Sequence, residues 1–537
     1  MKKKIFIFAI FLNSILTINA QTPEWEWANS FKGSSYKTAT DNEGNCYLTG
    51  GFNGTTIYFD SYMLNSFGAS DVFVVKYNSS GNVEWAYNYG SSFIESGQSI
   101  AVDDDGNCYI TGSFSGPTIT LGTTTFTNHG DVDFFTIKIN QSGEILWANS
   151  FGGSGNDMST DISIDEIGNV FITGRYDSPE INIGTDTMAS IEEWDIFVMK
   201  FDPEGNVAWG SSSGGEGVEY TSSICTDING DVFITGKFAS PMYFIGNDTL
   251  FNPFGNEIFI LKYDTEGNAV WYTNIASTSS SYGSGIDTDD SGNFYVTGYY
   301  NGDSISFDDV TLINTVDYTF DIYIVKFDSL YNVVWAKNAG GTSIDGAYDI
   351  STDSYGNSYI TGEFSSNEIA FGPFTLIKDG DLDIFVAKYD SNGNELWAIS
   401  AGGDNYDEGL SVSSIESDNC YVTGHYMSNY IAFGDDTLIN PTTTTYYQFV
   451  SKIGIKTGEE INTVNDGIQI YPNPTNGLFT IEGITDENTF FEITDITGRI
   501  IQTGYLKNKQ EIVDLSKYNN GLYVLKIDGQ TILLLKQ

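Results

Sequence analysis

The 537-residue sequence is poor in the residues from which many catalytic centres are built. It contains only 2 His and 4 Cys, which leaves little material for a His-based metal site, a Cys/His pair or a dense disulfide framework. Cations are also scarce, since 23 Lys and Arg stand against 71 Asp and Glu and the net charge is −48. Affinity for nucleic acids and anionic lipids comes chiefly from Lys and Arg that neutralise phosphates, so this balance argues against nucleic acid as a partner.

Apolar and aromatic residues, by contrast, are plentiful. The hydrophobic fraction is 40% and includes 36 Phe and 34 Tyr, so we expect a packed core and a folded protein. Length alone predicts three or four domains of about 150 residues each. Internal repeats replace that estimate with one large domain, as described below.

The first 20 residues have the parts of a secretory signal peptide. Residues 2–4 are Lys, residues 5–18 are mostly apolar, and Ala20 precedes the expected cleavage point. A membrane-spanning helix needs about 20 apolar residues, and this run is shorter and interrupted by polar residues. We therefore expect removal of residues 1–20 on entry to the periplasm and no transmembrane segment in the mature chain.

The C-terminal residues 466–537 alternate between short apolar strands and turns rich in Pro, Asn and Gly, a pattern typical of a small β-sandwich. The characteristic residues are Tyr471, Pro472, Asn473, Pro474 and Gly477, followed later by Gly521, Leu522, Tyr523 and Lys526. The segment closely resembles the C-terminal sorting domain of type IX secretion cargo in Bacteroidetes. The resemblance implies export across the outer membrane by the type IX machinery, with the domain usually removed and the passenger released or attached to surface lipopolysaccharide. The alternative is an ordinary β-sandwich binding module.

Between the two ends lies a repeat of about 62 residues. Its period is marked by Trp27, Trp85, Trp147, Trp209, Trp271, Trp335 and Trp397. Each unit holds an Asp-x-x-Gly-Asn turn leading into a Thr-Gly strand, a variable Ile-x-Phe-Gly segment, a strand that ends in Lys, and the Trp strand. Period-2 alternation without helical periodicity predicts about four short strands per unit, which is one blade of a propeller, with the Trp strand outermost.

The units are phased so that the two ends of the array complement each other. The seventh unit has its Thr-Gly strand and its Lys strand but lacks a Trp strand, whereas residues 26–31 match the Trp strand of residues 147–151. We therefore expect an all-β, seven-bladed β-propeller closed by an N-terminal strand; the alternative, an open β-solenoid, would need capping repeats. The predicted organisation is a signal peptide (1–20), a propeller (21–454), a linker (455–465) and a sorting domain (466–537).

The repeat also resembles a bacterial β-propeller repeat family found in many secreted surface proteins, with the signature Asp-x-x-Gly-Asn-x-Tyr-x-Thr-Gly. That resemblance covers residues 24–454 and implies an architecture but little about activity, because function lies in loops carried by the fold.

The most repeated acidic feature is the Asp-x-x-Gly-Asn turn. Its richest copies supply the candidate metal ligands Asp103, Asp105, Asp287 and Asp289, since alternating acids before a Gly resemble part of a calcium loop. The bidentate Glu of a full calcium loop is missing, and repeat seven lacks the Gly. The favoured alternative is a hairpin turn in which Asp accepts hydrogen bonds from backbone N–H groups and Gly supplies a positive φ.

A Lys recurs at one strand position in every repeat: Lys76, Lys138, Lys200, Lys262, Lys326, Lys388 and Lys452. A cation that recurs once per blade is expected to pair with a nearby acid for structural reasons. The consequence is a propeller surface with almost no free positive charge.

Four of the loops that enter a repeat carry Gly-Gly and an acid, and in propellers such loops line the face around the central channel. They supply the candidate ligand-binding residues Asp157, Glu216, Asp345, Asp404 and Asp407. Pairs of carboxylates on this face could serve as the acid and base of a glycosidase, although with 71 acids such pairs also arise by chance.

The Cys and His residues suggest no further chemistry. The four Cys are expected to be free, buried thiols, because equivalent strands of neighbouring blades lie too far apart for a disulfide. His129 and His425 lie on different repeats, and neither has an evident nucleophile or metal partner in the sequence.

We therefore expect a monomeric, secreted or cell-surface protein whose propeller binds a glycan or another surface protein without catalysis, with calcium as the one cofactor to consider. The alternative is a secreted polysaccharide hydrolase or lyase that uses carboxylates on the loop face. Aromatic residues beside convergent acids in the channel mouth would favour this alternative.

Overall fold

The computed structural model describes two stretches of the chain. They are residues 23–455, with gaps at 185, 253–254, 276, 315, 317, 416–418 and 443–444, and residues 469–536, with gaps at 472–477, 483–488, 496–498, 507–509, 519–520 and 528–529. The predicted signal peptide, the predicted linker from residue 456 onward, and Pro472, Asn473, Pro474 and Gly477 lie outside the described residues. The rest falls into two compact units, one within Thr22–Ile455 and one within Lys456–Gln537.

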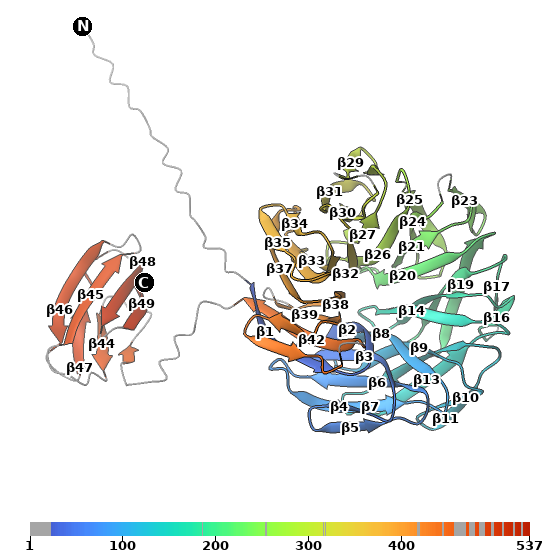
Figure 1. The fold of residues 1–537 in the computed structure, drawn as a ribbon, viewed down its shortest axis with the longest axis horizontal. Coiled ribbons are helices and arrows are strands. Elements are labelled where there is room, and N and C mark those ends of the chain that lie inside the picture. The colour runs from blue at the N-terminus through green and yellow to red at the C-terminus, as the bar shows by residue number, and fades with distance from the viewer. Residues whose placement is uncertain are drawn as a thin grey trace, which may run out of the picture. The chain divides into compact units, whose positions relative to one another are not determined.

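The first unit is a ring of antiparallel β-sheets (Figure 1), and every regular element in its described residues is a strand. We number the sheets 1 to 7 by their innermost strands. These strands are β2 (Ser34–Thr40), β8 (Glu95–Val102), β14 (Asp157–Ile164), β20 (Glu219–Thr226), β26 (Ser281–Thr288), β32 (Asp345–Thr352) and β38 (Asp407–Ile415). Each innermost strand contacts the next, and β38 contacts β2, so the described ring is closed.

The second strand of each sheet is the predicted Thr-Gly strand. These strands are β3 (Cys46–Asn53), β9 (Cys108–Phe114), β15 (Val170–Tyr176), β21 (Val232–Phe238), β27 (Phe294–Tyr300), β33 (Ser358–Phe364) and β39 (Asn419–Tyr426). The third strands end with the repeated Lys. They are β6 (Ser70–Tyr77), β12 (Asp133–Ile139), β18 (Asp195–Phe201), β24 (Glu257–Tyr263), β30 (Asp321–Phe327), β36 (Asp383–Tyr389) and β42 (Tyr447–Ile455).

The fourth, outermost strand of each sheet carries the repeated Trp. These strands are β7 (Val83–Tyr89), β13 (Ile145–Phe151), β19 (Val207–Gly215), β25 (Ala269–Ile275), β31 (Val333–Ala339), β37 (Glu395–Gly403) and, for sheet 7, β1 (Pro23–Phe31). The observed order, innermost, Thr-Gly, Lys, Trp, confirms the strand order predicted from the repeat. In sheet 7, Trp27 of β1 lies opposite Lys452 of β42, as Trp147 lies opposite Lys138 in sheet 2.

The variable Ile-x-Phe-Gly segments form β-hairpins between the second and third strands. They are β4 (Thr56–Phe59) with β5 (Tyr62–Asn65), β10 (Thr118–Leu121) with β11 (Thr124–Thr127), β16 (Glu180–Asn182) with β17 (Thr187–Ala189), β22 (Met242–Ile245) with β23 (Asp248–Phe251), β28 (Ser304–Phe307) with β29 (Val310–Ile313), β34 (Glu368–Phe371) with β35 (Phe374–Ile377), and β40 (Tyr430–Phe433) with β41 (Asp436–Ile439). Two of these hairpins extend the preceding sheet to six strands.

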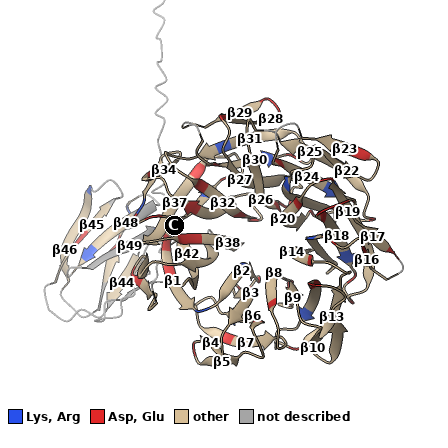
Figure 2. Cartoon of the chain, turned by 45° about the vertical axis from the view of Figure 1, so that its right-hand side comes forward, with Lys and Arg blue, Asp and Glu red and all other residues tan. Residues whose placement is uncertain are grey.

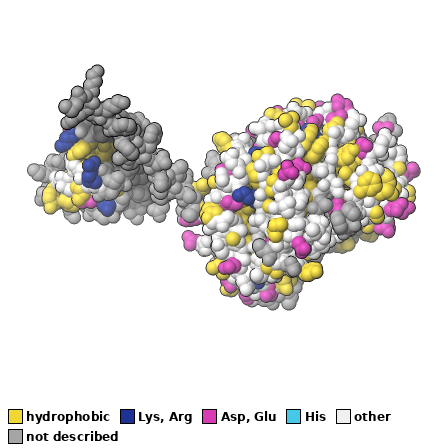
Figure 3. Space-filling view, turned by 90° about the horizontal axis from the view of Figure 1, so that it is seen from above, with side chains coloured by type: hydrophobic (Ala, Val, Ile, Leu, Met, Phe, Trp, Pro, Cys, Tyr) yellow, Lys and Arg dark blue, Asp and Glu magenta, His cyan; other side chains and the backbone are white. Residues whose placement is uncertain are grey.

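The core lies between neighbouring sheets. Second and third strands such as β18 and β30 are buried along their whole length, because both faces of each sheet are covered by the sheets on either side. β-Branched and aromatic residues fill these strands and suit that setting. The acidic residues, red in Figure 2, are distributed around the ring, and in Figure 3 they lie scattered over its surface with few Lys or Arg between them.

The second unit consists of two sheets. One contains β43 (Gln469–Tyr471), β44 (Leu478–Glu482) and β47 (Gln510–Asp514), and the other β45 (Thr489–Asp495), β46 (Ile500–Leu506), β48 (Gly521–Ile527) and β49 (Gln530–Lys536). Phe479 and Val513 of the first sheet and Ile493 and Leu525 of the second belong to one hydrophobic cluster. The chain is therefore all-β in its described residues, as predicted.

Candidate functional site

The ring has two distinct faces. Each innermost strand begins at what we call the loop face, where a loop brings the chain in from the preceding sheet. It ends at the turn face, where in sheets 1 to 6 a turn that begins with the repeated Asp and contains a Gly leads into the second strand. The third strand also runs from the loop face to the turn face, so its terminal Lys lies near the turns.

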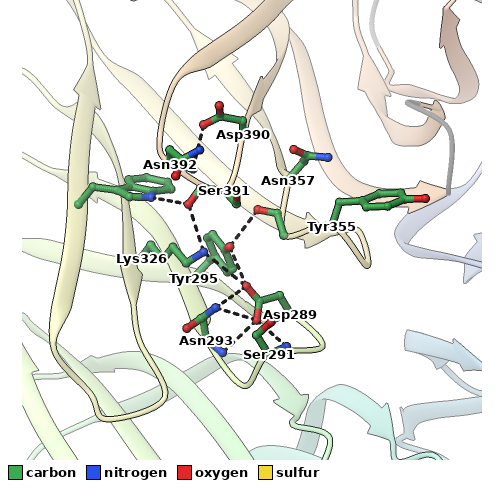
Figure 4. Close-up of polar contacts among 12 residues, drawn as sticks. Asp289, Ser291, Asn293, Tyr295, Lys326, Tyr355, Asn357, Asp390, Ser391 and Asn392 are labelled. Carbon is green, nitrogen blue, oxygen red and sulfur yellow. Dashed lines mark hydrogen bonds and ion pairs between the residues drawn. The ribbon is translucent and has the colours of Figure 1, made fainter.

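The turn face is built from one network, shown for Asp289 in Figure 4. The Asp289 carboxylate accepts hydrogen bonds from the backbone N–H groups of Ser291 and Asn293, each at 3.0 Å, and from the Tyr295 hydroxyl at 3.0 Å. Lys326 Nζ lies 3.4 Å from the same carboxylate, and Gly292 has a φ of 75°. Burial alone would raise the pKa of Asp289, but these hydrogen bonds, first those from Asn293, hold it below its ordinary value.

Most of the repeated Lys residues make similar contacts. The pairs are Lys76 with Glu84 (3.0 Å), Lys138 with Asp103 (3.7 Å), Lys262 with Asp227 (3.1 Å), Lys388 with Asp353 (3.8 Å) and Lys452 with Glu26 (2.8 Å), while Lys200 donates to the Thr265 carbonyl (3.3 Å). The predicted pairing with a nearby acid is thereby confirmed for the repeated Lys residues other than Lys200, which bonds to a backbone carbonyl instead. The repeated Asp acts as the predicted hairpin-turn residue in these copies.

The four predicted metal ligands lie at different places. Asp103 accepts hydrogen bonds from Asn107 N (2.8 Å) and the Tyr109 hydroxyl (2.9 Å), and Asp105 is exposed. Both line a cavity of about 570 Å³ on the turn face, together with Lys138. Asp287 lines the central channel and Asp289 serves its turn. In the described residues no three His, Cys, Asp or Glu side chains are grouped so that they could hold a metal ion, and the calcium site stays a prediction.

Three of the predicted ligand-binding acids lie inside the loop face. Asp157, Asp345 and Asp407 are each 0% exposed. Asp157 accepts hydrogen bonds from Gly153 N (2.6 Å) and Ser178 Oγ (2.7 Å), so it holds its loop from within. Burial raises the pKa values of Asp157 and Asp407 to about 6. Their burial gives these acids a supporting role, and they do not present a carboxylate to solvent.

A second acid lies beside each of these positions, at the start of the preceding third strand. Asp133 is buried next to Asp157 and adds to the rise in its pKa, after the larger effect of burial. A Cβ on Gly152 would lie 2.1 Å from Asp133 Oδ1, and one on Gly153 would lie 2.4 Å from the Glu180 carbonyl oxygen. The Gly-Gly pair is therefore required by close packing around the buried acids. We call these acids the junction carboxylates: Asp71, Glu95, Asp133, Asp157, Asp195, Glu219, Glu257, Asp321, Asp345, Asp383 and Asp407.

The other two predicted ligand contacts, Glu216 and Asp404, are exposed on the loop face. Asp404 accepts a hydrogen bond from Asn429 N at 2.9 Å. The structure thus separates the five predicted acids into three that support loops and two that face solvent.

The central channel is crossed by an ion pair. Lys37 Nζ of sheet 1 lies 2.6 Å from Asp349 Oδ1 of sheet 6, in a cavity of about 240 Å³ lined by all the innermost strands. Asp161 and Asp287 line the same cavity and accept hydrogen bonds from backbone N–H groups of the neighbouring sheets. Burial, followed by the Asp349 charge, raises the pKa of Asp287 to about 7. These groups tie sheets together across the channel.

At the loop-face end of the central channel, unlike in the turn network, the side chains differ from one repeat to the next. This end of the channel carries a continuous row of side chains that crosses sheets 3 to 7. We call it the loop-face arc: Trp194, Arg175, Tyr220, Lys237, Tyr282, Tyr299, Tyr348, Glu363, Glu408, His425 and Tyr446.

The first half of the arc is cationic and aromatic. Arg175 Cζ lies over the rings of Trp194 (4.5 Å) and Tyr220 (4.3 Å). Lys237 Nζ lies over the rings of Tyr220 (4.9 Å) and Tyr282 (4.6 Å). Each cation therefore contacts one ring of the next sheet, and Tyr220 is shared between them.

The middle of the arc consists of tyrosines. The ring centroids of Tyr282 and Tyr299 are 4.7 Å apart in a stacked arrangement, and Tyr299 meets Tyr348 edge-on at 6.2 Å. Burial, followed by the nearby Tyr282, raises the pKa of Tyr299 to about 12.

The last part of the arc is acidic. Glu363 is 8% exposed, and burial, followed by the Glu408 charge, raises its pKa to about 7, while a hydrogen bond from Tyr348 partly opposes the rise. Glu408 Oε1 lies 3.3 Å from His425 Nε2. The His425 ring lies 4.3 Å from that of Tyr446, so His425 has an acidic partner that the sequence did not suggest.

In the sequence, the arc is marked by one position of each repeat. The residue directly after each repeated Thr-Gly is Gly51, Ser113, Arg175, Lys237, Tyr299, Glu363 or His425. It is small in the first two repeats and different in each of the other five. Of these residues only His425 stands out in the sequence by its residue type, because the repeat is recognised by what its copies share and this position is one at which they differ.

The four cysteines are free and buried, as predicted. His129, on another sheet, is paired with the buried Asp133 at 3.0 Å through Nδ1. Neither observation adds a nucleophile to the loop face.

Comparison with known proteins identifies the C-terminal unit and finds two curated proteins with partial similarity to this chain. Residues 469–537 match the family described as secretion system C-terminal sorting domain. An uncharacterized WD repeat-containing protein of Acanthamoeba polyphaga mimivirus is 24% identical over 442 residues, which are 68% of this chain and 32% of that protein. Regulatory protein FlaEY of Caulobacter vibrioides is 28% identical over 143 residues, 26% of this chain and 15% of that protein. The chain thus spans a third or less of the curated relatives it matches.

Among solved structures, two show a similarity to this chain, each with a TM-score below 0.5. The Pan2 WD40 domain of Neurospora crassa has a TM-score of 0.41 and 8% identity, over 82% of this chain and 97% of that domain. PorZ, a surface component of the type IX secretion system of Porphyromonas gingivalis, has a TM-score of 0.17 and 10% identity, over 95% of this chain and 100% of that protein.

The sorting domain predicted from the sequence is confirmed by the family match. This chain is a propeller-like protein that the type IX system secretes to the cell surface or outside. Among the described residues, none forms a helix of the length and apolarity needed to cross a membrane.

Proposed function

We propose that the first unit is a seven-bladed β-propeller over residues 21–454, closed by an N-terminal strand and followed by a linker (455–465) and a β-sandwich sorting domain (466–537). Support comes from the closed series of contacts between innermost strands and from the pairing of β1 with β42. The cluster shared by the two C-terminal sheets supports the sandwich.

We propose that this propeller is a non-catalytic binding or adhesion protein of the outer surface, and that the loop-face arc binds a glycan. One observation carries the proposal. The side chains of the arc differ from one repeat to the next, whereas the hydrogen bonds and ion pairs of the turn face recur in most repeats. Positions that support the fold recur in each blade, so unrepeated, partly exposed aromatic and charged residues are best explained by a ligand.

The arc has suitable chemistry for sugars. The partly exposed tyrosine rings offer apolar surface to the C–H groups of a pyranose ring, and their hydroxyl groups can make hydrogen bonds. The charged ends of the arc supply further donors and acceptors that fix the orientation of the ligand. The exposed Glu216 and Asp404 are proposed as additional contacts from the surrounding loops.

The test is binding of the secreted protein to a glycan array, with and without calcium. The double substitution Tyr282→Ala and Tyr299→Ala should abolish the signal, while Tyr58→Ala, an exposed tyrosine on the β4–β5 hairpin, should leave it unchanged. Loss of the wild-type signal in a chelator would support calcium assistance. An unchanged signal from the arc variant would place the ligand elsewhere and overturn the proposal.

A second candidate function is hydrolysis or lysis of a polysaccharide by Glu363 and Glu408. It is favoured by the tyrosines that lie beside Glu363 and Glu408 at the channel mouth, the arrangement expected for this alternative, and by the pKa of about 7 for Glu363, which suits a general acid near neutral pH. Product analysis on the bound polymers tests it. Release of reducing ends or unsaturated sugars that disappears in Glu363→Gln would establish catalysis, and binding without products would exclude it for those polymers.

A further inference from the structure

Two cations of the arc, Arg175 and Lys237, have no carboxylate within 4 Å among the described residues of a protein that has 71 acids; the Asp177 charge acts on Arg175 only from farther away, where it partly opposes the fall in its pKa caused by burial. Arg175 is one of the two arginines of the chain, and Lys237 lies on the next sheet. Within the described residues, neither makes a hydrogen bond or an ion pair, and both contact only aromatic rings through their charged groups. Most other lysines of the ring, by contrast, have a carboxylate within 4 Å or donate to a carbonyl.

This arrangement is electrostatically unfavourable by itself. Arg175 and Lys237 both lie over the ring of Tyr220. Burial lowers the pKa of each, and the Arg175 charge lowers that of Lys237 further. Two like charges, partly withdrawn from water and close together, favour the arrival of an anion, because it would neutralise both.

The ring contacts also leave the right donors available. A guanidinium that stacks on aromatic rings still directs its N–H groups outward in its own plane, where they match the two oxygens of a carboxylate. Lys237 contacts Tyr282, the first of the stacked tyrosines. A ring that carries a carboxylate would therefore find a cation pair and an aromatic face side by side.

We propose that Arg175 and Lys237 form a subsite for the carboxylate of an acidic sugar, so that the ligand of the arc is a uronate-containing polysaccharide. This inference rests on the proposed glycan-binding function. The nearby tyrosines favour a sugar over an acidic peptide, since an extended acidic peptide offers many carboxylates but few rings to stack.

The experiment uses the full secreted chain and a matched pair of probes, oligogalacturonate and its fully methyl-esterified counterpart. Wild type should bind the acid form about tenfold more tightly or better, as expected for charge-assisted hydrogen bonds. Arg175→Gln and Lys237→Gln should each reduce that preference, and the double variant should bind both probes equally. Arg175→Lys should retain part of the preference. Lys337→Gln, which removes a cation already paired with Glu395 at 3.3 Å, is the control and should keep it in full.

The outcomes separate the two proposals. Equal binding of both probes by wild type overturns the carboxylate subsite and leaves glycan binding standing. Binding of no glycan at all overturns both proposals. Tighter binding of a poly-glutamate peptide than of oligogalacturonate, lost in the double variant, would assign the subsite to acidic peptides and overturn the sugar class. A melting curve for each variant identifies any that is misfolded, and Arg175→Lys then provides the folded comparison.

Discussion

The two faces of the ring use acidic residues in opposite ways. On the turn face, Asp289 accepts hydrogen bonds from backbone N–H groups and the Tyr295 hydroxyl and pairs with Lys326, and its pKa is held below its ordinary value. On the loop face, junction carboxylates such as Asp157 are buried with fewer donors and close to one another, and their pKa values are raised. Similar residues thus stabilise the charged form on one face and the protonated form on the other.

The comparison also separates structure from function. Features shared by several blades, namely the Asp turn, the paired Lys and the Gly-Gly loop, have structural explanations in hydrogen bonds and close packing. Features that differ from blade to blade, above all the loop-face arc, do not stabilise the fold in any common way. In this repeat protein, the positions that indicate function are those at which the residue type differs between repeats.

Deletion of residues 21–31 should lower the stability of the protein more than any substitution described below, because both faces depend on closure of the ring. It removes β1 and its pairing with β42, including the buried Phe31. Loss of one buried Phe side chain alone costs about 3–5 kcal/mol, so we expect a marked fall in melting temperature. Removal of residues 456–537, which form a separate compact unit, is the control. An unchanged melting curve for the first deletion would refute closure by β1.

The turn network should be more sensitive to mutation than an exposed copy of the same motif. Asp289→Ala leaves Lys326 buried without its carboxylate and should cost about 3 kcal/mol of unfolding free energy. Asp264 begins an Asp-x-x-Gly-Asn turn that is exposed to solvent, and Asp264→Ala should cost about 1 kcal/mol or less. Denaturant unfolding measures both. Equal losses would mean that burial and the Lys do not distinguish the two turns.

The opposed pKa shifts predict a pH optimum for stability on the acidic side. The pKa values of Asp157, Asp195 and Asp407 are raised to about 6 and those of Glu219 and Asp383 to about 7. Between the ordinary carboxyl pKa and these values the folded state binds more protons than the unfolded state, so stability falls as pH rises through that range. We expect a higher melting temperature at about pH 5 than at about pH 8.

Below about pH 4 the trend should reverse, because acids with lowered pKa values, such as Asp289 and Asp264, lose their stabilising charge there. A melting temperature that rises steadily from about pH 5 to about pH 8 would contradict the raised values on the loop face.

Glu363→Gln should change the stability of the protein least. The amide imitates the protonated acid, so it should raise stability at about pH 8 by about 1 kcal/mol or less and change it little at about pH 5. Glu368→Gln, at an exposed position on β34, is the control and should have no effect at either pH. Destabilisation by Glu363→Gln at about pH 8 would show that the ionised form of Glu363 is the stabilising one.

The repeat made much of the fold predictable. The strand order within each unit and the pairing of residues 23–31 with the last sheet follow from matching copies of one pattern, and the structure confirms both. The roles of the repeated Asp and Lys were also predictable, because a charge that recurs once per unit needs a partner that recurs as well.

The candidate site was less accessible from the sequence. Loop acids such as Asp345 look solvent-facing next to Gly-Gly, yet their carboxylates turn inward to accept backbone hydrogen bonds. The arc joins residues that lie far apart in the sequence, such as Arg175 with Tyr220 and Lys237 with Tyr282, each pair separated by 45 positions. Each belongs to a different unit, so only the curvature of the ring brings them together.

The pairing of β1 with β42 bears on how the protein reaches its folded state. Ser35 and Gln448, near that junction, share a hydrogen bond across 413 residues of sequence. During synthesis β1 is made long before its partner β42. We therefore expect β1 to remain unpaired while the intervening sheets form. Contacts of such long range slow the final folding step. The last event in folding is therefore expected to be the meeting of the two chain ends of the ring, and any chain that stops before residue 447 leaves one strand edge open to association with other chains.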